Sequence, residues 1–333
     1  MAEKYFSDLG KIEAINLLLK EYSFDISHGA WFETSGKSFI TTASRMYLEG
    51  IDFDLVYFPL KHLGYKCIIG VCGELYAQMS LPRTLGICIG VSAKLDFPQI
   101  QELWSGMAKA AKEQGFKDVE LDLVPSRNGL AISVSATGET SFEAGERRPA
   151  AKSKDLICIS GSLGAAYMGL QVLEREKKFF ENGGEVSLEE NRMLVQAYLK
   201  PELDPRTVSQ LEEAEIYPSH GYFITRGLAD TLKKLSRDSG LGAKVYADKI
   251  PFEGNTFKLG KELNIDPVSA AMNGGDDYHL LFTIPILSLE KFRREFQTFD
   301  IIGHLALPEA GTVLVTPDGL EMPVRAQGWN DEE

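Results

Sequence analysis

The sequence lacks any apolar run long enough to cross a bilayer. Its longest apolar runs, "CIIGVC" and "LGICIGV", are far shorter than the roughly 20 residues that a spanning helix needs. It also lacks the apolar core of a signal peptide, because charges occur throughout residues 1–20. These absences predict a cytoplasmic protein with no membrane partner.

The chain has fewer basic than acidic residues. The 35 Lys and Arg residues are outnumbered by 48 Asp and Glu, which gives a formal net charge of -13. Non-specific binding to nucleic acid needs a basic surface that displaces counterions, so we expect no nucleic-acid partner. An anionic small molecule is still allowed, because cations or helix N-termini can make one site locally positive.

Cysteine is rare and is not arranged for metal binding or disulfide exchange. The chain has 4 cysteines, and none of them forms a Cys-x-x-Cys pair. Buried, reduced thiols are therefore the simplest interpretation of Cys67, Cys72, Cys88 and Cys158.

The length of 333 residues favours two domains over one compact core. The best boundary is the charged, aperiodic stretch "ETSFEAGERRPAAKSKD" at 139–155. We therefore expect domains at 1–140 and 150–333. Strands and helices alternate irregularly on both sides, which is typical of an α+β fold.

Helical periodicity and caps predict a helix over 96–115, with Asp96 as its cap, Pro98 in its first turn and Gly115 at its end. A second helix is expected at 60–79, although its glycines weaken that prediction. Further helices are expected at 162–180, 187–199, 207–215 and 225–239. Strands are expected at 86–93, 129–139, 156–161, 243–247, 278–285, 300–307 and 312–319.

Two glycine-rich turns could carry chemistry. In "SGSLGAAYMG" a strand leads into a helix whose free amides could hold phosphate, but tight packing of strand against helix explains its glycines more simply. In "NGGDDYHLLFTIP" two carboxylates, Asp276 and Asp277, lie at the mouth of an apolar strand. They could bind a ligand, or they could simply turn the loop that precedes the strand.

The second motif resembles the "GGEDYELLFT" signature of the bacterial thiamine-monophosphate kinases, members of the aminoimidazole ribotide synthase superfamily. The resemblance covers nearly the whole chain, through "FSDLGKIEAI", "LEGIDFDLVYFPLKHLGYK", "GLAISVSATGE", "RRPAAKSKDLICISGSLGAAYMGLQVLE" and "AQGWN". It implies a two-domain fold, with an N-terminal mixed α/β domain that forms a homodimer and a C-terminal α+β domain. It also implies phosphorylation of thiamine monophosphate by ATP with Mg²⁺.

Phosphoryl transfer depends on neutralising anionic groups, and the family uses aspartates on several loops to hold magnesium. The resemblance places the retained site residues as follows. The metal ligands are Glu74, Asp122 and Asp25; the catalytic residues are Asp122 and Arg226; the nucleotide contacts are Arg148 and Asp122; and the substrate contacts are Asp52, Asp276 and Trp329.

Several family aspartates are missing. Two positions of the early "GDDAAV" motif read Ile26 and Ser27, and the "TTD" loop reads "TTASRMYLEG", with Ala43 in place of the aspartate. The "DISDG" loop reads "FITRG", so Phe223 and Arg226 replace both of its aspartates. The "GGDT" loop falls on "ELDLVPSRNG" and keeps only Asp122.

Arg226 turns a metal ligand into a permanent cation. At about 4 Å and an effective dielectric near 20, one pair of unit charges interacts by roughly 4 kcal/mol, so magnesium would be repelled. Arginine binds phosphate well, and one hypothesis is that Arg226 replaces part of the metal's role. Another is that the site is inactive, and a third is that Arg226 only points to solvent.

Each retained residue also has a plainer interpretation. Asp122 and Glu74 fit solvated side chains, Arg148 fits a linker charge, and Trp329 fits a residue that packs the C-terminal segment. Other superfamily enzymes fit less well. Selenophosphate synthetases need an early reactive Cys or selenocysteine, and hydrogenase-maturation members end in Cys; this chain has neither.

The sequence thus predicts a thiamine-monophosphate kinase-like protein with weakened or lost activity. The alternative is a non-catalytic protein of the same fold that binds a nucleotide or another partner.

Overall fold

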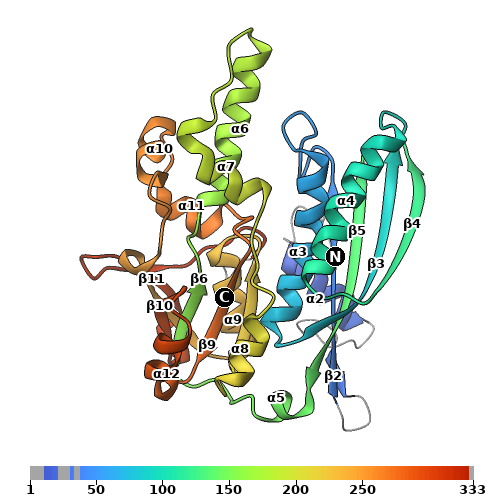
Figure 1. The fold of residues 1–333 in the computed structure, drawn as a ribbon. Helices are drawn as coiled ribbons and strands as arrows, with labels where there is room; N and C mark the ends of the chain where they lie inside the picture. The colour runs from blue at the N-terminus through green and yellow to red at the C-terminus, as the bar shows by residue number, and fades with distance from the viewer. Residues whose placement is uncertain (1–10, 22–30, 34–37, 330–333) are drawn as a thin grey trace.

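Two β-sheets, each covered by helices, make up the computed structural model, which describes residues 11–21, 31–33 and 38–329. In Figure 1 the five-stranded sheet stands on the right and the seven-stranded sheet on the left, with α6 projecting upward from the second. The charged stretch at 142–155 joins them.

The first sheet has the order β1-β2-β5-β3-β4. Its pairs are antiparallel except for the parallel pair β3–β4, which leaves β4 as a free edge. Its strands are β1 (Trp31–Glu33), β2 (Ser38–Leu48), β3 (Leu81–Ser92), β4 (Asp118–Ser126) and β5 (Ala131–Ser141).

Helices α3 (Leu60–Ala77) and α4 (Phe97–Glu113) cover one face of this sheet. Asp96 caps α4 as expected. Its Oδ1 accepts a hydrogen bond from the backbone N–H of Gln99 at 2.9 Å, and Gln99 Oε1 accepts one from the backbone N–H of Asp96. Glycines allow the two helices to pack closely, since a Cβ on Gly106 would lie 1.9 Å from the Lys61 carbonyl oxygen.

The second sheet has the order β12-β11-β8-β10-β6-β9-β7. Its strands are β6 (Leu156–Ser160), β7 (His220–Ile224), β8 (Gly242–Tyr246), β9 (His279–Ile284), β10 (Phe299–Ala306), β11 (Thr312–Val315) and β12 (Glu321–Pro323). The remaining helices are α2 (Lys11–Glu21), α5 (Phe142–Glu146), α6 (Ala165–Glu181), α7 (Arg192–Leu199), α8 (Thr207–Glu213), α9 (Leu228–Ser239), α10 (Thr256–Leu263), α11 (Pro267–Asn273) and α12 (Leu289–Glu295).

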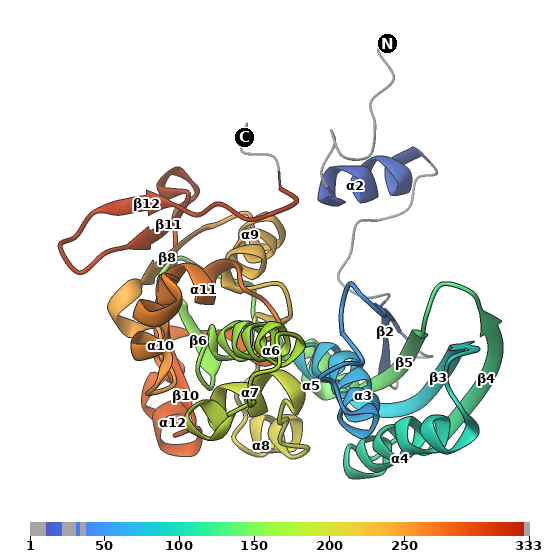
Figure 2. The same ribbon diagram turned by 90° about the horizontal axis from the view of Figure 1, so that it is seen from above.

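Helix α3 lies between the two halves of the molecule. Besides the first sheet and α4, it contacts β7, β9 and α7 of the second half. Figure 2, which looks down on the molecule, shows α3 between the sheet on the right and the α6–α7 pair on the left. Most of its residues are buried, which is why an apolar helix with little amphipathic character is stable here.

Four expectations about local structure were wrong. The "TTAS" and "ELDL" segments, expected as loops, lie within β2 and β4, because each continues a ladder of backbone hydrogen bonds with its neighbour. The helix expected over 187–199 begins only at Arg192, after a short 3-10 turn. The helix expected from Thr225 begins at Leu228, because Gly227 has a φ of 92°.

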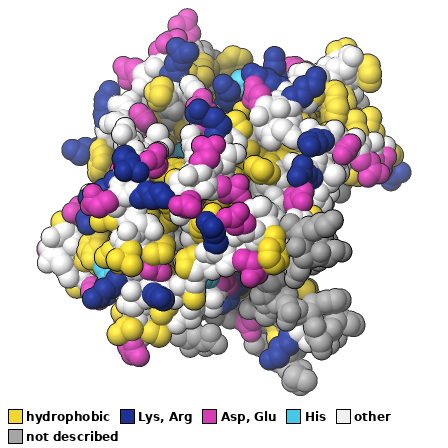
Figure 3. Space-filling view, turned by 60° about the horizontal axis from the view of Figure 1, so that its bottom comes forward, with side chains coloured by type: hydrophobic (Ala, Val, Ile, Leu, Met, Phe, Trp, Pro, Cys, Tyr) yellow, Lys and Arg dark blue, Asp and Glu magenta, His cyan; other side chains and the backbone are white. Residues whose placement is uncertain are grey.

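None of the helices in the described part of the chain is both long and apolar enough to span a membrane. On the face shown in Figure 3, basic and acidic side chains of the described residues are interspersed with hydrophobic ones. That face does not carry the continuous basic stripe expected of a nucleic-acid-binding protein.

The contact between α3 and α4 yields a stability prediction. Gly106→Ala should lower the free energy of unfolding by about 1–3 kcal/mol, because the added methyl group meets backbone rather than a side chain that can move. Urea denaturation measures this change. Gly254→Ala is the matched control, since a Cβ there would have no neighbour within 4 Å. Equal stability of the two variants would contradict the packing argument.

Candidate active site

A polar cavity of about 190 Å³ lies between β2, α3 and β7. Glu74 is the acidic residue of its lining, and the hydroxyls of Thr42 and Ser44 and the amide of Gln78 add further polar groups. The complete lining is Thr41, Thr42, Ala43, Ser44, Glu74, Gln78, Gly221 and Tyr222. The cavity therefore lies between β2, where the resemblance places a family aspartate at the position of Ala43, and β7, which leads to the "FITRG" turn.

Glu74 projects from α3 and is partly buried. Burial raises the pKa of its carboxyl group, and the positive charges of Lys234, Arg45 and Arg226 act in the opposite direction. Asp230 adds a negative charge that raises the pKa further. Glu74 thus lies among groups that are mostly cationic, an arrangement that suits an anionic ligand better than a second positive ion.

The start of "FITRG" lies in β7 and is apolar. Phe223 is 4% exposed and packs edge-on against Tyr278, with ring centroids 5.3 Å apart. Its ring also fills the space over Gly73 of α3, where a Cβ would lie 2.4 Å from ring atoms. A buried aromatic ring therefore occupies the place where the family resemblance puts an aspartate.

Arg226 follows in the turn before α9 and is exposed. Its backbone packs over the Gly-Gly turn, since a Cβ on Gly275 would lie 3.4 Å from the Arg226 Cα. Among the residues that the structure describes, Arg226 has no ion-pair partner. Its guanidinium group is available to a ligand.

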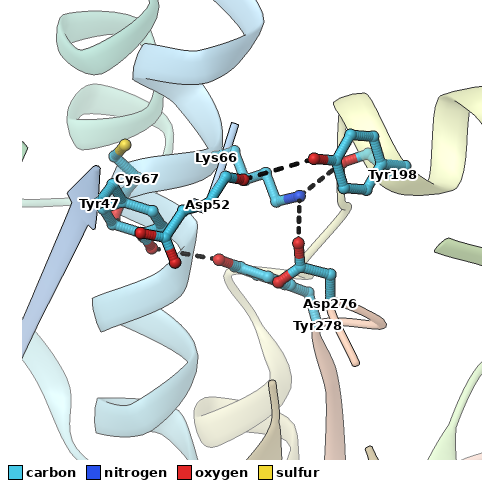
Figure 4. Close-up of polar contacts among 7 residues, drawn as sticks. All are labelled: Tyr47, Asp52, Lys66, Cys67, Tyr198, Asp276 and Tyr278. Carbon is cyan, nitrogen blue, oxygen red and sulfur yellow. Dashed lines mark hydrogen bonds and ion pairs between the residues drawn. The ribbon is translucent and has the colours of Figure 1, made fainter. Parts of the chain in front are cut away.

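Lys66 is the centre of a buried polar network (Figure 4). Its side chain is 3% exposed, and its ammonium group donates to the Tyr198 carbonyl oxygen at 2.8 Å and to Asp276 Oδ2 at 3.1 Å. It also lies 3.9 Å from the centre of the Tyr198 ring. Burial lowers the pKa of Lys66, and the carboxylate of Asp276 partly offsets that shift.

Arg45 extends this network from β2. Its guanidinium carbon lies 5.5 Å from the centre of the Tyr47 ring and 5.4 Å from that of Tyr278. The two tyrosine hydroxyls are 3.2 Å apart, so β2 and the start of β9 meet directly. Arg45 is thereby fixed beside Glu74, and the cation–π contacts hold its charge in place.

The two carboxylates of "NGGDD" have different environments. Asp276 has a φ of 62°, is 30% exposed and pairs with Lys66. Asp277 is 4% exposed at the start of α6. Burial raises the pKa of Asp277 to about 8, although the backbone N–H groups of Gly164 and Ala166 stabilise its anion. Asp276 therefore ties the loop to α3, whereas Asp277 is buried without a geometric hydrogen-bond partner among the described residues.

Arg148 is close to the cavity through Gln78. Its Nη1 donates to Gln78 Oε1 at 3.1 Å, and Gln78 Nε2 donates to the Gly221 carbonyl oxygen at 3.1 Å. Burial lowers the pKa of Arg148 to about 10, and the nearby Tyr222 phenol acts against that shift. The expectation of a solvated linker charge does not hold, because Arg148 is built into the wall behind the cavity.

The other expected site residues are more scattered. Asp122 is exposed on β4, and two strands lie between β4 and β2, so about 14 Å of sheet separates Asp122 from Ala43. Asp52 is exposed in the turn after β2, where Oδ2 accepts the Leu48 amide at 2.8 Å. Asp25, Ile26 and Ser27 lie outside the described residues.

Trp329 packs the C-terminal segment onto α9. Its indole nitrogen donates to Asp230 Oδ1 at 2.9 Å, and Arg237 lies 5.5 Å from the centre of its ring. Asp230 also pairs with Lys234 at 2.8 Å. The indole is therefore held against the helix that begins beside the cavity.

The described residues do not fit a magnesium site. Among 11–21, 31–33 and 38–329, no three His, Cys, Asp or Glu side chains are grouped so that they could hold a metal ion. Three cations, Lys234, Arg45 and Arg226, act on Glu74, and Asp230 is the carboxylate that acts on it. Magnesium at a phosphate site is usually held by one or two carboxylates together with phosphate oxygens and waters, and the cations that act on Glu74 oppose a further positive charge there.

Sequence reasoning missed Arg45, Lys66, Gln78 and Lys234. A signal existed for Lys66, since it is a charged residue within the long apolar helix "LKHLGYKCIIGVCGELYA" and must find a buried partner there. Lys234 lies one helical turn after Asp230 in α9, a spacing that brings opposite charges together. Arg45 had no such signal, because its segment was expected to be a loop.

Known proteins resemble this chain over most of its length. Thiamine-monophosphate kinase from Aquifex aeolicus is 25% identical over 280 residues, which are 84% of this chain and 87% of that protein. The kinase from Pyrococcus horikoshii is 25% identical over 322 residues, 95% of this chain and 94% of the relative. No protein-family model matches the chain.

Solved structures share the fold. The structure of AaThiL complexed with AMPPCP and TMP aligns with 99% of this chain and 100% of the AaThiL chain, with a TM-score of 0.82 and 22% sequence identity. HypE of E. coli, a hydrogenase maturation protein, covers 94% of this chain and 97% of its own, with a TM-score of 0.65 and 16% identity. The nucleotide analogue and TMP are ligands of AaThiL.

The paired sheets share the aminoimidazole ribotide synthase-like fold of these solved structures, as expected from the sequence. Among proteins of known activity, the chain is similar to thiamine-monophosphate kinases, at 22–26% identity over most of its length.

The buried carboxyl of Asp277 predicts a dependence of stability on pH. Because its folded-state pKa of about 8 is above its ordinary value of 3.8, the folded chain keeps a proton that the unfolded chain releases between these values. The stabilisation is complete below the ordinary value and is lost as pH rises through the folded-state pKa. This group should lower the unfolding free energy by at most about 1.4 kcal/mol per pH unit within that window.

Asp277→Asn should remove this contribution, because an amide of nearly the same shape does not titrate in this range. Chemical denaturation from about pH 5 to pH 8 should show a flatter profile for the variant than for the parent chain. Asp318→Asn is the control, because Asp318 is exposed and its pKa is lowered by the Thr316 hydroxyl. Parallel profiles for Asp277→Asn and the parent would contradict the burial argument.

Proposed function

We propose that this chain binds ATP in the cleft beside α3 and acts as a thiamine-monophosphate kinase-like protein whose phosphoryl transfer to thiamine phosphate is weakened or lost. Homology to the kinases supports the choice of ligands. The observation that carries the proposal is the charge around the cavity: Glu74 is the acidic group in its lining, and Arg45, Arg226 and Lys234 are near it.

Phosphoryl transfer requires the charge on the transferred group to be neutralised while donor and acceptor are aligned. Arg45 and Lys234 can offset phosphate charge from fixed positions, and Gln78, held by Arg148, can donate a hydrogen bond from the cavity wall. Glu74 is placed to orient an acceptor or to hold a proton. Without a cluster of carboxylates, the remaining groups favour binding over rapid chemistry.

The site roles expected from the resemblance remain proposals. Asp276 and Trp329 already have protein partners, because Asp276 Oδ2 pairs with Lys66 and the indole nitrogen donates to Asp230. A non-catalytic nucleotide-binding protein is the second candidate, and the absence of a three-acid cluster among the described residues favours it. The domain division at 1–140 and 150–333 is likewise a proposal.

Activity is tested by a chromatographic search for thiamine diphosphate after overnight incubation of micromolar protein with ATP, magnesium and thiamine monophosphate. We expect slow product formation that falls at least tenfold in Glu74→Gln, because the carboxylate in the cavity is removed. Glu102→Gln, on the exposed face of α4, is the matched control and should keep the parent rate.

Rapid turnover of the parent chain would contradict a weakened site. Absence of product from every protein, with ATP binding intact, would instead favour the non-catalytic candidate.

The free edge of the first sheet supports the homodimer. β4 exposes Val119, Leu121 and Leu123 on alternate positions, each at least 41% accessible. An exposed edge strand with an apolar face is a site for association with another chain. A second copy of this chain fits the resemblance, which implies dimerisation through the first domain.

Sedimentation velocity should show a dimer for the parent chain and a monomer for Leu121→Glu/Leu123→Glu, because two buried carboxylates would oppose the interface. Leu287→Glu is the control, since Leu287 is 95% exposed and lies on the second half. A parent chain that sediments as a monomer would overturn the proposed dimer.

A further inference from the structure

The cavity beside α3 has more cationic than acidic neighbours. Lys234, Arg45 and Arg226 all lie within electrostatic reach of Glu74, while Asp230 is the acidic neighbour that acts on it. Asp230 is itself paired with Lys234 at 2.8 Å. Counting Glu74, these groups leave a net positive charge around the cavity.

A fourth cation lies behind the wall. Arg148 reaches the cavity through its 3.1 Å hydrogen bond to Gln78, which is a lining residue. Arg148 is held between the two halves rather than in solvent, so its charge is screened less than that of a surface arginine. The positive field at the cavity therefore has sources on β2, α9, the turn before α9 and the segment at Arg148, and it is opposed by Asp238, which accepts from the lining Tyr222 hydroxyl at 2.7 Å.

The two kinds of cation are suited to different tasks. Arg45 is fixed by Tyr47 and Tyr278, so it supplies charge at a set position. Arg226 is exposed and has no ion-pair partner among the described residues, so its guanidinium fork can move onto a ligand. Guanidinium groups bind phosphate oxygens in pairs of parallel hydrogen bonds, which an isolated divalent ion does not do.

We infer that this cavity binds the phosphate tail of a nucleoside triphosphate without a divalent cation, with Arg226 as the mobile phosphate ligand. The inference rests on the proposed nucleotide-binding function and deepens it. Protein cations supply the counter-charge, so a metal ion that already neutralises the phosphates weakens the attraction instead of providing it. Phosphate groups cannot bind directly beside Glu74, because its carboxylate repels an anion.

The test is isothermal titration calorimetry of the full chain with ATP, once in EDTA and once in excess magnesium. We expect binding in EDTA at least as tight as in magnesium. Arg226→Ala should weaken the binding in EDTA at least tenfold. Arg226→Asp, which restores an acidic residue, should weaken it further. Arg206→Ala is the control, because Arg206 is exposed and paired with Asp204 away from the cavity lining.

The outcomes separate this inference from the function on which it rests. Binding that appears only with magnesium overturns the inference and leaves the proposed ATP binding standing. No binding in either buffer overturns both. Binding in EDTA that is unchanged in Arg226→Ala overturns the role given to Arg226.

Sodium tripolyphosphate in EDTA provides the second probe. If the phosphate tail is the recognised group, it should compete with ATP, and its binding should show the same loss in Arg226→Ala. Failure to compete would contradict recognition through the phosphates. Urea denaturation of each variant should give the same free energy of unfolding as the parent chain, which shows that the substitutions leave the fold intact.

Discussion

The ion pair between Lys66 and Asp276 holds together the parts of the protein that form the cleft. Lys66 is on α3, whose other face packs on the first sheet, while Asp276 is in the turn that enters β9 of the second. Removing one partner of a buried ion pair typically costs about 3–5 kcal/mol, because the other charge is left without compensation. The Tyr198 carbonyl oxygen further satisfies the ammonium group, so this lysine fixes three segments at once.

The candidate site depends on that arrangement. Arg45 stacks on Tyr278, which follows Asp276 by two residues, and Tyr278 in turn packs on Phe223 at the edge of the "FITRG" turn. Positions of β2, α3 and β7 are thereby set relative to one another, and the cavity is the space that remains between them. Its positive surroundings follow from residues that also have structural partners, with Arg226 as the exception.

Local signals in the sequence were sufficient for many elements. The capping box of Asp96 and Gln99 and the left-handed Gly240 after α9 are determined by residues next to each other in the chain. The strands β2 and β4 were missed as strands because their pairing partners are distant in sequence, and β4 does not alternate between buried and exposed residues.

The site was harder to predict, for the same reason. The resemblance pointed to Glu74, Arg148 and Arg226, and these lie near the cavity or act on its lining. It could not show that Phe223 is accommodated by a glycine of α3, nor that Arg45 is held between two tyrosines. Such facts depend on contacts between segments far apart in the chain, which no local pattern encodes.

Because α3 contributes side chains to the cores of both halves, the boundary between them is not a place where the chain can be divided without loss. A fragment ending near residue 140 would expose to water the face of α3 that covers β7 and β9. That face includes Lys66, whose side chain is buried in the intact chain. A fragment beginning near residue 150 would lose Gly73 of α3, against which the ring of Phe223 packs. The two sheets are thus joined through a shared helix, and the cleft lies along that contact.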